Sequence, residues 1–230
     1  MQDRIDAYYE IVLKNFIKKV DQLKIESNEL EGLKKGLETY AQKPTPFIRT
    51  VDLNQMGLLS REIAKLVEAG KLERIKQGNF RLVEFSQNEN EAMLISELYP
   101  DGVLCMTTAL FYYGYSDRTP MSWDIAINRN TSKARFNIDY PYVKPYYVEK
   151  AHLEYGVSEI EYDSCSLKIF DKDRLICECL KHENKMDREI VNKAIQRYIV
   201  DNEKNVKHLL EYAMKRNIQN KVRERIGVWL

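Results

Sequence analysis

The chain has 230 residues and a mass of 27.2 kDa, with 44% hydrophobic and 31% charged residues. This balance is typical of a soluble globular protein, so it excludes a disordered chain and a collagen-like chain. Because 36 Lys and Arg residues face 35 Asp and Glu residues, the formal net charge is only +1. A polyanionic partner would therefore have to bind a local patch of bases, not the whole surface.

No apolar run approaches the roughly 20 residues that a membrane-spanning helix needs. The start MQDRIDAYYE lacks the basic region and apolar core of a signal peptide. We therefore expect a cytoplasmic protein with no membrane partner. Few cysteines in a chain of this length indicate reduced core residues and not a disulfide framework. They are Cys105, Cys165, Cys177 and Cys179.

Apolar residues at three- and four-residue steps predict an amphipathic helix over residues 4–25 and a second helix over 29–41. The second helix ends before Pro44 and Pro46, because proline cannot continue a helix. Together the two helices suggest a helical hairpin, in which residues 1–27 form an extension.

The segment after Phe47 predicts a winged helix-turn-helix domain: a short helix, a turn at Met56-Gly57, a second helix and two strands. Ser60 is a natural N-cap for the second helix, and Gly70 ends it. Its residues Ile63, Leu66 and Val67 point inward, whereas Arg61, Glu62, Lys65 and Glu68 point outward. The strands LERI and FRLVEF flank KQGN, where Gly78 and Asn79 supply the positive backbone angles of a hairpin, the predicted wing.

Five acids and no base lie between Glu84 and Asp101, which indicates a domain boundary near residue 86. The predicted domains are the extension 1–27, the winged helix 28–86 and a carboxyl-terminal domain 87–230. In the last of these, Thr107 is expected to cap a short helix that Gly114 ends. Short connections between the strands that follow favour antiparallel pairing. From Asp171 onward the period is helical, so the predicted fold class is α+β, with strands first and helices after.

A recognition helix presents polar and basic side chains to DNA, and a wing supplies bases to the flanking backbone. Residues 49–81 hold seven bases against four acids, a local charge of +3. A winged helix can also serve as a protein-interaction module, and this alternative stays open. The predicted DNA-binding residues are Arg49, Ser60, Arg61, Glu62, Lys65, Lys76, Gln77, Asn79 and Arg81.

The last helices carry a second group of bases, and the same segment, residues 204–225, holds only two acids, Glu211 and Glu224. It is either a nucleic-acid or partner surface, or a solvated helical face whose bases complement the helix dipoles. The group consists of Lys204, Lys207, Lys215, Arg216, Lys221, Arg223 and Arg225.

We find no catalytic motif, and we expect no catalytic residue, metal or cofactor. The three histidines lie far apart, and Cys177 and Cys179 form a CxC, which is no zinc or redox motif. One acidic cluster resembles the carboxylates of a metal-dependent nuclease, although alternating acids on an exposed strand explain it more simply. This cluster consists of Glu159, Glu161 and Asp163, followed by Lys168.

Three stretches of the chain form a specific series. The first is MGLLSREIAKLVEAGKLERIKQGNF, a turn, a helix and the entry to a hairpin. The second is YPDGVLCMTTALFYYGYSDRTP, which holds Thr108-Ala109-Leu110, Tyr113-Gly114 and the turn from Ser116 to Pro120. The third is LKIFDKDRLICECLKHENKMDREIVNKAIQRYI, with LLEYAMKRNI after it. Together, over most of residues 50–220, they resemble the AbiEi family of antitoxins, in which the position of Phe80 is more often Tyr.

The resemblance implies a DNA-binding antitoxin of a bacterial type IV toxin–antitoxin pair, an abortive-infection system of phage defence. Its winged helix would repress its own operon at promoter inverted repeats. Its carboxyl-terminal domain would counteract a nucleotidyltransferase-like toxin without a stable complex. Arg61 and Lys65 would enter the major groove, and Lys76 and Arg81 would grip the flanking backbone. The helix over 4–25 is an extension relative to the family, which either covers the winged helix or pairs in a dimer on DNA.

Two other hypotheses stay open. One is a nucleic-acid-processing enzyme that uses Glu161, Asp163 and Lys168, with the winged helix delivering the substrate. The other is a protein-interaction module that sequesters the toxin directly, which co-purification of the two proteins would reveal.

Overall fold

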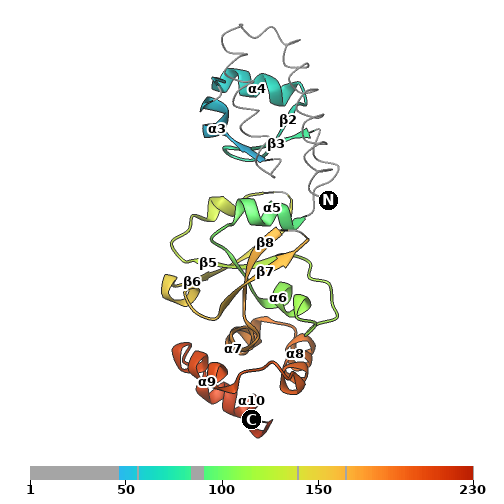
Figure 1. Cartoon of the computed structure of the whole chain (residues 1–230), viewed down its shortest axis with the longest axis vertical. Coiled ribbons are helices and arrows are strands. Elements are labelled where there is room, and N and C mark those ends of the chain that lie inside the picture. Colours follow the sequence, from blue (N-terminus) through green and yellow to red (C-terminus); the bar gives the residue numbers. More distant parts are fainter. Residues whose placement is uncertain (1–46, 56, 84–90, 139, 164, 230) are drawn as a thin grey trace. The chain divides into compact units, whose positions relative to one another are not determined.

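The computed structural model describes residues 47–55, 57–83, 91–138, 140–163 and 165–229. The chain has an α+β fold and divides into two compact units, residues 1–93 and 94–230 (Figure 1). The helices expected over 4–25 and 29–41, and the domain boundary expected near residue 86, lie outside the described residues.

The described residues up to 83 in unit 1 form two helices and a three-stranded antiparallel sheet. The strand order is β1-β3-β2, so β3 is central and the β2–β3 hairpin lies at one edge. Strand β1 pairs with β3 over its whole length and was not among the predicted elements. The elements are β1 (Phe47–Arg49), α3 (Thr50–Gln55), α4 (Ser60–Glu68), β2 (Leu72–Lys76) and β3 (Asn79–Leu82).

Helix α4 has the predicted inward face, with Ile63 and Leu66 buried. Its start differs from the prediction, because the N-cap is Leu59 and not Ser60. Leu59 has an extended backbone, and its N–H donates to the Glu62 carboxylate at 2.6 Å. Glu62 thus provides the backward half of a capping box, which satisfies one backbone donor at the helix start.

The β2–β3 hairpin turns where the sequence predicted. Gly78 has a φ of +77°, a left-handed conformation that costs glycine little. Asn79 does not share this conformation, contrary to the prediction; it begins β3 and pairs with Lys76. The pairing register of β2 with β3 shifts between Arg74 and Lys76, where β2 has a β-bulge.

Unit 2 is built on a five-stranded mixed sheet of order β6-β5-β4-β8-β7. The expected antiparallel pairing is correct for β4 with β5 and for β7 with β8, but wrong for β5 with β6 and β4 with β8, which are parallel. The connection over residues 129–142, which includes a 3-10 helix, exceeds the dozen residues that a parallel crossover needs. The strands are β4 (Val103–Leu104), β5 (Trp123–Asn128), β6 (Val143–Val148), β7 (Val157–Tyr162) and β8 (Cys165–Phe170).

Helices cover both faces of this sheet, with α5 on one side and α6 and α7 on the other (Figure 1). Helix α7 is central, because it packs against α6, α8, α9 and α10. The helical run after Asp171 is confirmed. The helices are α5 (Glu91–Leu98), α6 (Met106–Tyr112), α7 (Lys172–His182), α8 (Arg188–Val200), α9 (Val206–Lys215) and α10 (Gln219–Arg225). The short 3-10 helices are η2 (Lys133–Phe136), η3 (Lys150–Leu153), η4 (Glu183–Lys185) and η5 (Gly227–Trp229).

The start of α6 depends on a buried carboxylate and not on a cap from Thr107. Cys105 is the N-cap, and Thr107 donates its backbone N–H to Asp124 of β5 at 2.9 Å. Asp124 also accepts a hydrogen bond from Ser122 at 3.0 Å. At the other end the prediction holds, because Gly114 follows the helix with a φ of +68°.

Three cysteines lie in the core of unit 2 and the fourth, Cys165, is half-buried; all four are free thiols. Burial raises the pKa of each thiol. The expected core position is therefore confirmed for Cys105, Cys177 and Cys179, but not for Cys165. Within the described ranges, no helix has the length and apolar character that spanning a bilayer requires.

Candidate nucleic-acid interface

The outer face of α4 carries the predicted polar and basic side chains. Ser60, Arg61, Lys65 and Glu68 are exposed, and the Arg61 side chain retains 75% of its accessible surface. Arg61 and Lys65 are four residues apart, so they lie on the same helical face. The face therefore offers two cations, a hydroxyl and the Glu68 carboxylate to solvent.

Glu62 is the exception on this helix. It was expected to point outward with the DNA-facing residues, but it is buried. Its carboxylate accepts the Leu59 N–H, which draws the side chain back toward the helix start. The carboxylate also lies 3.7 Å from Arg61 Nε, so Glu62 forms an ion pair with a cation of the outer face.

The hairpin turn is fastened to the start of α3. The Thr50 N–H donates to the Gly78 carbonyl at 2.9 Å, so the turn and the first helix hold each other. Gln77 is exposed in the turn, and Lys76 and Asn79 are half-buried beside it. The Asn79 side chain donates to the Gln77 carbonyl at 3.3 Å, which orders the turn further.

All three predicted DNA-binding arginines have a carboxylate partner. For Arg61 it is Glu62, with 3.7 Å between Nε and Oε1. Arg49 donates to both carboxylate oxygens of Asp52, at 2.9 and 3.0 Å. Arg81 lies opposite Glu73 in the β2–β3 ladder and forms an ion pair with it, with only 16% of its side chain exposed. Arg49 and Arg81 must each exchange a carboxylate for a phosphate before they can contact DNA.

Arg74 is an exposed base of the hairpin to which the sequence analysis gave no role. It lies opposite the buried Phe80, and its guanidinium carbon is 5.5 Å from the ring centroid. The only signal in the sequence was its place among the seven bases. The cross-strand register, which decides that it stacks on Phe80, is a tertiary feature.

The second group of bases is not one continuous surface. Arg216 was expected on it, but it is buried and binds Glu178 of α7. The buried side chains of α9 pack against α7, and Arg216, directly after this helix, lies in the same interface.

The other six bases of this group differ in the contacts that they make. Lys221 donates to the Leu180 carbonyl at 3.0 Å, and Arg225 donates to Asn192 at 2.7 Å. The Lys215 ammonium lies over the Tyr155 ring, and Lys204 donates to the Asp201 carbonyl. Lys207 and Arg223 are exposed, and neither makes an ion pair with any residue that the structure describes.

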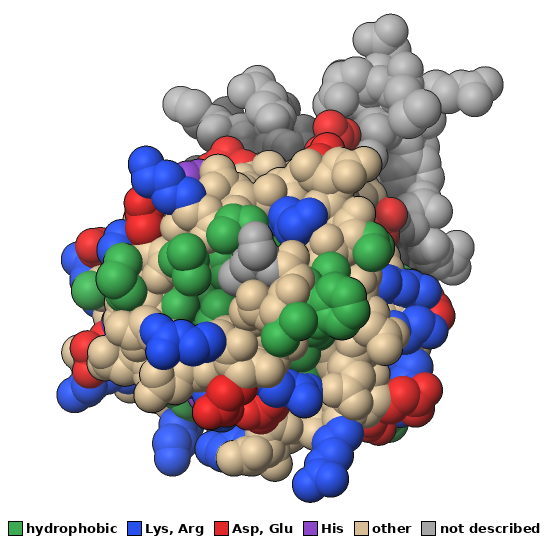
Figure 2. All heavy atoms as spheres, turned by 90° about the horizontal axis from the view of Figure 1, so that it is seen from below, with side chains coloured by type: hydrophobic (Ala, Val, Ile, Leu, Met, Phe, Trp, Pro, Cys, Tyr) green, Lys and Arg blue, Asp and Glu red, His purple; other side chains and the backbone are tan. Residues whose placement is uncertain are grey.

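The same end of unit 2 exposes apolar side chains, with Lys and Arg around them (Figure 2). Val200 at the end of α8 is 74% exposed, and Trp229 of η5 is 65% exposed. Both border an open groove of about 450 Å³. Its lining consists of Asn192, Ile195, Gln196, Ile199, Val200, Arg225 and Trp229.

The acidic cluster lies on the edge strand β7 and the turn that follows it. Glu159 and Glu161 are exposed, opposite Lys168 and Ser166 of β8. Asp163, also exposed, occupies the turn. Within the part of the chain that the structure describes, no three or more His, Cys, Asp or Glu side chains are grouped so that they could hold a metal ion.

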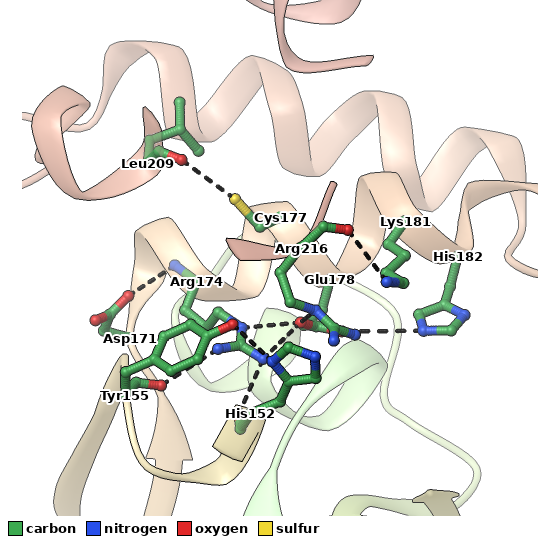
Figure 3. A network of polar contacts seen from close by, with 10 residues as sticks. All are labelled: His152, Tyr155, Asp171, Arg174, Cys177, Glu178, Lys181, His182, Leu209 and Arg216. Atoms are coloured by element: carbon green, nitrogen blue, oxygen red, sulfur yellow. Dashed lines mark hydrogen bonds and ion pairs between the residues drawn. The ribbon is translucent and has the colours of Figure 1, made fainter. Parts of the chain in front are cut away.

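A buried Arg–Glu–Arg cluster joins α7 to α9 and was not predicted (Figure 3). Arg174, Glu178 and Arg216 are all less than 5% exposed. Arg174 donates to Glu178 Oε1 at 2.8 Å, and Arg216 Nη2 donates to Oε2 at 2.9 Å. Arg216 Nε lies 2.6 Å from Oε1 without hydrogen-bond geometry, so that contact is ionic. The four-residue spacing of Arg174 and Glu178 was the available signal.

Two aromatic rings enclose the Arg174 guanidinium. Its central carbon is 4.2 Å from the Tyr155 ring centroid and 4.6 Å from that of Phe170. The cluster affects its surroundings, because burial and the charge of Arg216 lower the pKa of Lys181. Burial, Arg216 and Arg174 likewise lower the pKa of His152.

The chain matches no protein-family model and no curated protein. The geometry defines an α+β protein of two compact units. One unit carries an exposed basic helix beside a hairpin, and the other carries a buried cationic cluster.

Proposed function

We propose that unit 1 is a winged helix-turn-helix domain that binds DNA, with α4 as the recognition helix and the β2–β3 hairpin as the wing. The observation that carries the proposal is the outer face of α4, where Ser60, Arg61 and Lys65 are exposed. Arg61 retains 75% of its side-chain surface although its Nε lies 3.7 Å from Glu62. A major groove about 12 Å wide accepts one α-helix, and arginine and lysine there bind guanine edges.

The hairpin supports the same proposal. Its turn is exposed at Gln77 and fixed to α3 through Gly78, so it is held in place as a wing requires. Lys76 and Gln77 would contact the phosphate backbone beside the groove, a contact that positions a protein without reading sequence. Arg49 and Arg81 would join them on exchange of Asp52 and Glu73 for phosphate.

For the whole chain we propose the antitoxin role that the AbiEi resemblance implies: repression of its own operon at promoter inverted repeats, and antagonism of a nucleotidyltransferase-like toxin, without catalysis. The second and third stretches of the resemblance contact each other in unit 2, which supports treating them as parts of one family pattern. Asp117 of the turn forms ion pairs with Lys193 and Arg197 of α8. Its neighbour Arg118 forms ion pairs with Asp187 and Glu189.

The test is fluorescence anisotropy of the purified chain on its own upstream DNA and on a random duplex of equal length, across a salt series. We expect a preference of about a thousandfold or more for the upstream DNA. Affinity should fall steeply as salt rises, because bound cations release counterions from the phosphates. Equal, weak binding to both duplexes would contradict the DNA-binding proposal.

Direct sequestration of the toxin is a second candidate, favoured by the groove that Val200 and Trp229 border. Exposed apolar patches rimmed by polar residues mark interaction sites. Co-purification of the chain with its toxin, lost on Trp229→Asp, would establish this mode. Metal-dependent cleavage of nucleic acid, lost on Glu161→Ala, would instead establish the enzyme hypothesis.

A further inference from the structure

A cavity of about 300 Å³ lies in unit 2, between the edge strand β6 and helix α7. Its walls are mostly apolar, and Phe170 and Pro145 are among them. The volume is at the lower end of the range for small-molecule sites, which combine apolar walls with a few polar groups. The polar members of the lining are Cys105, Tyr146, Tyr147, Glu178, His182 and Lys185.

Three of these polar groups have no hydrogen-bonding partner in the described ranges: the Tyr146 hydroxyl, the His182 ring and the Lys185 ammonium. His182 lies 3.9 Å from Glu178 and packs edge-on against the Tyr146 ring, with 6.2 Å between the ring centroids. Burial lowers the pKa of His182, against the opposing effect of Glu178, which favours the neutral ring with its one N–H. All three groups can therefore donate to a ligand.

The charges around the cavity favour an anion. Glu178 is bound by two buried guanidinium groups, so the cluster behind it carries one net positive charge. Lys185 adds an exposed cation at the cavity, and Lys181 lies beside Arg216. Asp124 is enclosed by donors from Thr107 and Ser122. Three cations, Arg216, Lys185 and Lys181, act on His182 against one acid, Glu178, so an anion at this ring would offset the excess of positive charge.

The backbone of the wall is strained at one point. Met106, which lines the cavity, has a φ of +43°, a left-handed conformation that costs a residue with a Cβ atom about 1–3 kcal/mol. Hydrogen bonds from Cys105 and Thr107 to Asp124 hold it there. Such strain is concentrated at ligand sites, and here it coincides with the cavity.

We propose that this cavity binds a small molecule that joins an apolar part to one anionic group, a carboxylate or a phosphate. The apolar part occupies the space beside Phe170 and Pro145. The anionic group binds Lys185, His182 and Tyr146. The proposal concerns unit 2 alone and does not depend on the proposed DNA binding.

The test is titration of the isotope-labelled full chain, followed by amide chemical shifts, with four ring compounds that differ mainly in charge. Benzoate and phenyl phosphate are the anionic probes, benzamide is neutral and benzylamine is cationic. We expect saturable shifts in β6 and at the end of α7 for at least one anion, with a Kd near or below about 1 mM. Benzamide and benzylamine should bind at least about tenfold more weakly, a difference of about 1.4 kcal/mol.

Variants locate the site. Lys185 is exposed, so Lys185→Gln should leave the fold intact and weaken binding of the anion about fivefold or more. Tyr146→Phe removes one donor and should weaken it less. Lys207→Gln, an equal loss of charge away from the cavity, is the control and should change nothing. The proposal is overturned if neither anion binds, if benzamide binds equally well, or if Lys185→Gln has no effect.

Discussion

Arg216, the C-cap of α9, donates to Glu178 of α7 across a distance of 2.9 Å, and neither side chain has more than 4% of its surface exposed. The pair is 38 residues apart in sequence, so it connects the last helices of unit 2 to the helix that packs on the sheet. Arg174 completes the cluster from within α7. A carboxylate shared by two buried guanidinium groups is thus the polar centre of this unit.

Glu178→Ala should destabilise unit 2 strongly. The change leaves two guanidinium groups buried without their shared carboxylate, and breaking a buried ion pair in this way costs about 3–5 kcal/mol. Urea denaturation monitored by circular dichroism measures the loss. Glu224→Ala, at an exposed position of α10, is the control and should stay within about 0.5 kcal/mol of the parent. A small effect of Glu178→Ala would show that water reaches the cluster.

Gly156→Ala should destabilise unit 2 more than Gly114→Ala. Both glycines have left-handed backbones, with φ values of +64° and +68°. A Cβ at residue 156 would lie 2.7 Å from Arg174 Cβ, whereas one at residue 114 would meet nothing within 4 Å. We expect about 2–4 kcal/mol for the first change, from backbone strain and overlap, and about 1–2 kcal/mol for the second. Equal losses in urea denaturation would refute the close contact.

The pH dependence of stability should include a contribution from Asp201. Burial raises its pKa, but hydrogen bonds from Lys172 and Tyr115 outweigh burial and lower it to about 2. Because the folded pKa is below the unfolded value of about 3.9, this stabilisation is present above pH 4 and is lost as the pH falls toward 2. Asp201→Asn should therefore cost about 2 kcal/mol at pH 7.

The gap between Asp201→Asn and the parent should close between about pH 5 and pH 2. Urea denaturation at a series of pH values measures it. Asn202→Asp, at an exposed neighbouring position, controls for a general effect of charge in this turn. A gap that stays constant with pH would mean that the loss arises from packing and not from the carboxylate.

Arg61→Ala should relax sequence discrimination by about 1–3 kcal/mol if the side chain reads a base. Lys76→Ala should instead weaken binding about equally on all sequences and reduce the salt slope by about one, as expected for a phosphate contact. Anisotropy titrations on the upstream DNA and on a random duplex measure both. Equal losses for Arg61→Ala on the two duplexes would remove its base-reading role.

Glu73→Gln should strengthen DNA binding on any sequence. Glu73 forms an ion pair with Arg81, so loss of this carboxylate removes one competitor of a phosphate for the guanidinium. We expect an affinity gain of severalfold that shrinks as salt rises. Glu224→Gln makes the same change of charge in unit 2, so it separates a local effect from one of net charge. If both variants gain equally, Arg81 is not a DNA contact.

Much of the local structure could be predicted from the sequence. The spacing of Ile63 and Leu66 predicted the inward face of α4, and Gly78 predicted the hairpin turn; both are confirmed. The helical run after Asp171 is confirmed as well. These features depend on the period of apolar residues and on backbone angles that glycine adopts easily, and both are readable within a few residues.

Strand pairing and the burial of charged side chains depend on the tertiary structure. The parallel pairing of β5 with β6, the inward turn of Glu62 and the burial of Arg216 all differ from the expectations. A charged side chain in an amphipathic pattern looks exposed until a partner of opposite charge is brought to it, and that partner can be 38 residues away. From the amino-acid sequence one can read the period of the apolar residues and the positions of the turns. Only folding determined which strands pair and which charges meet, because these contacts depend on distances between segments that are remote along the chain.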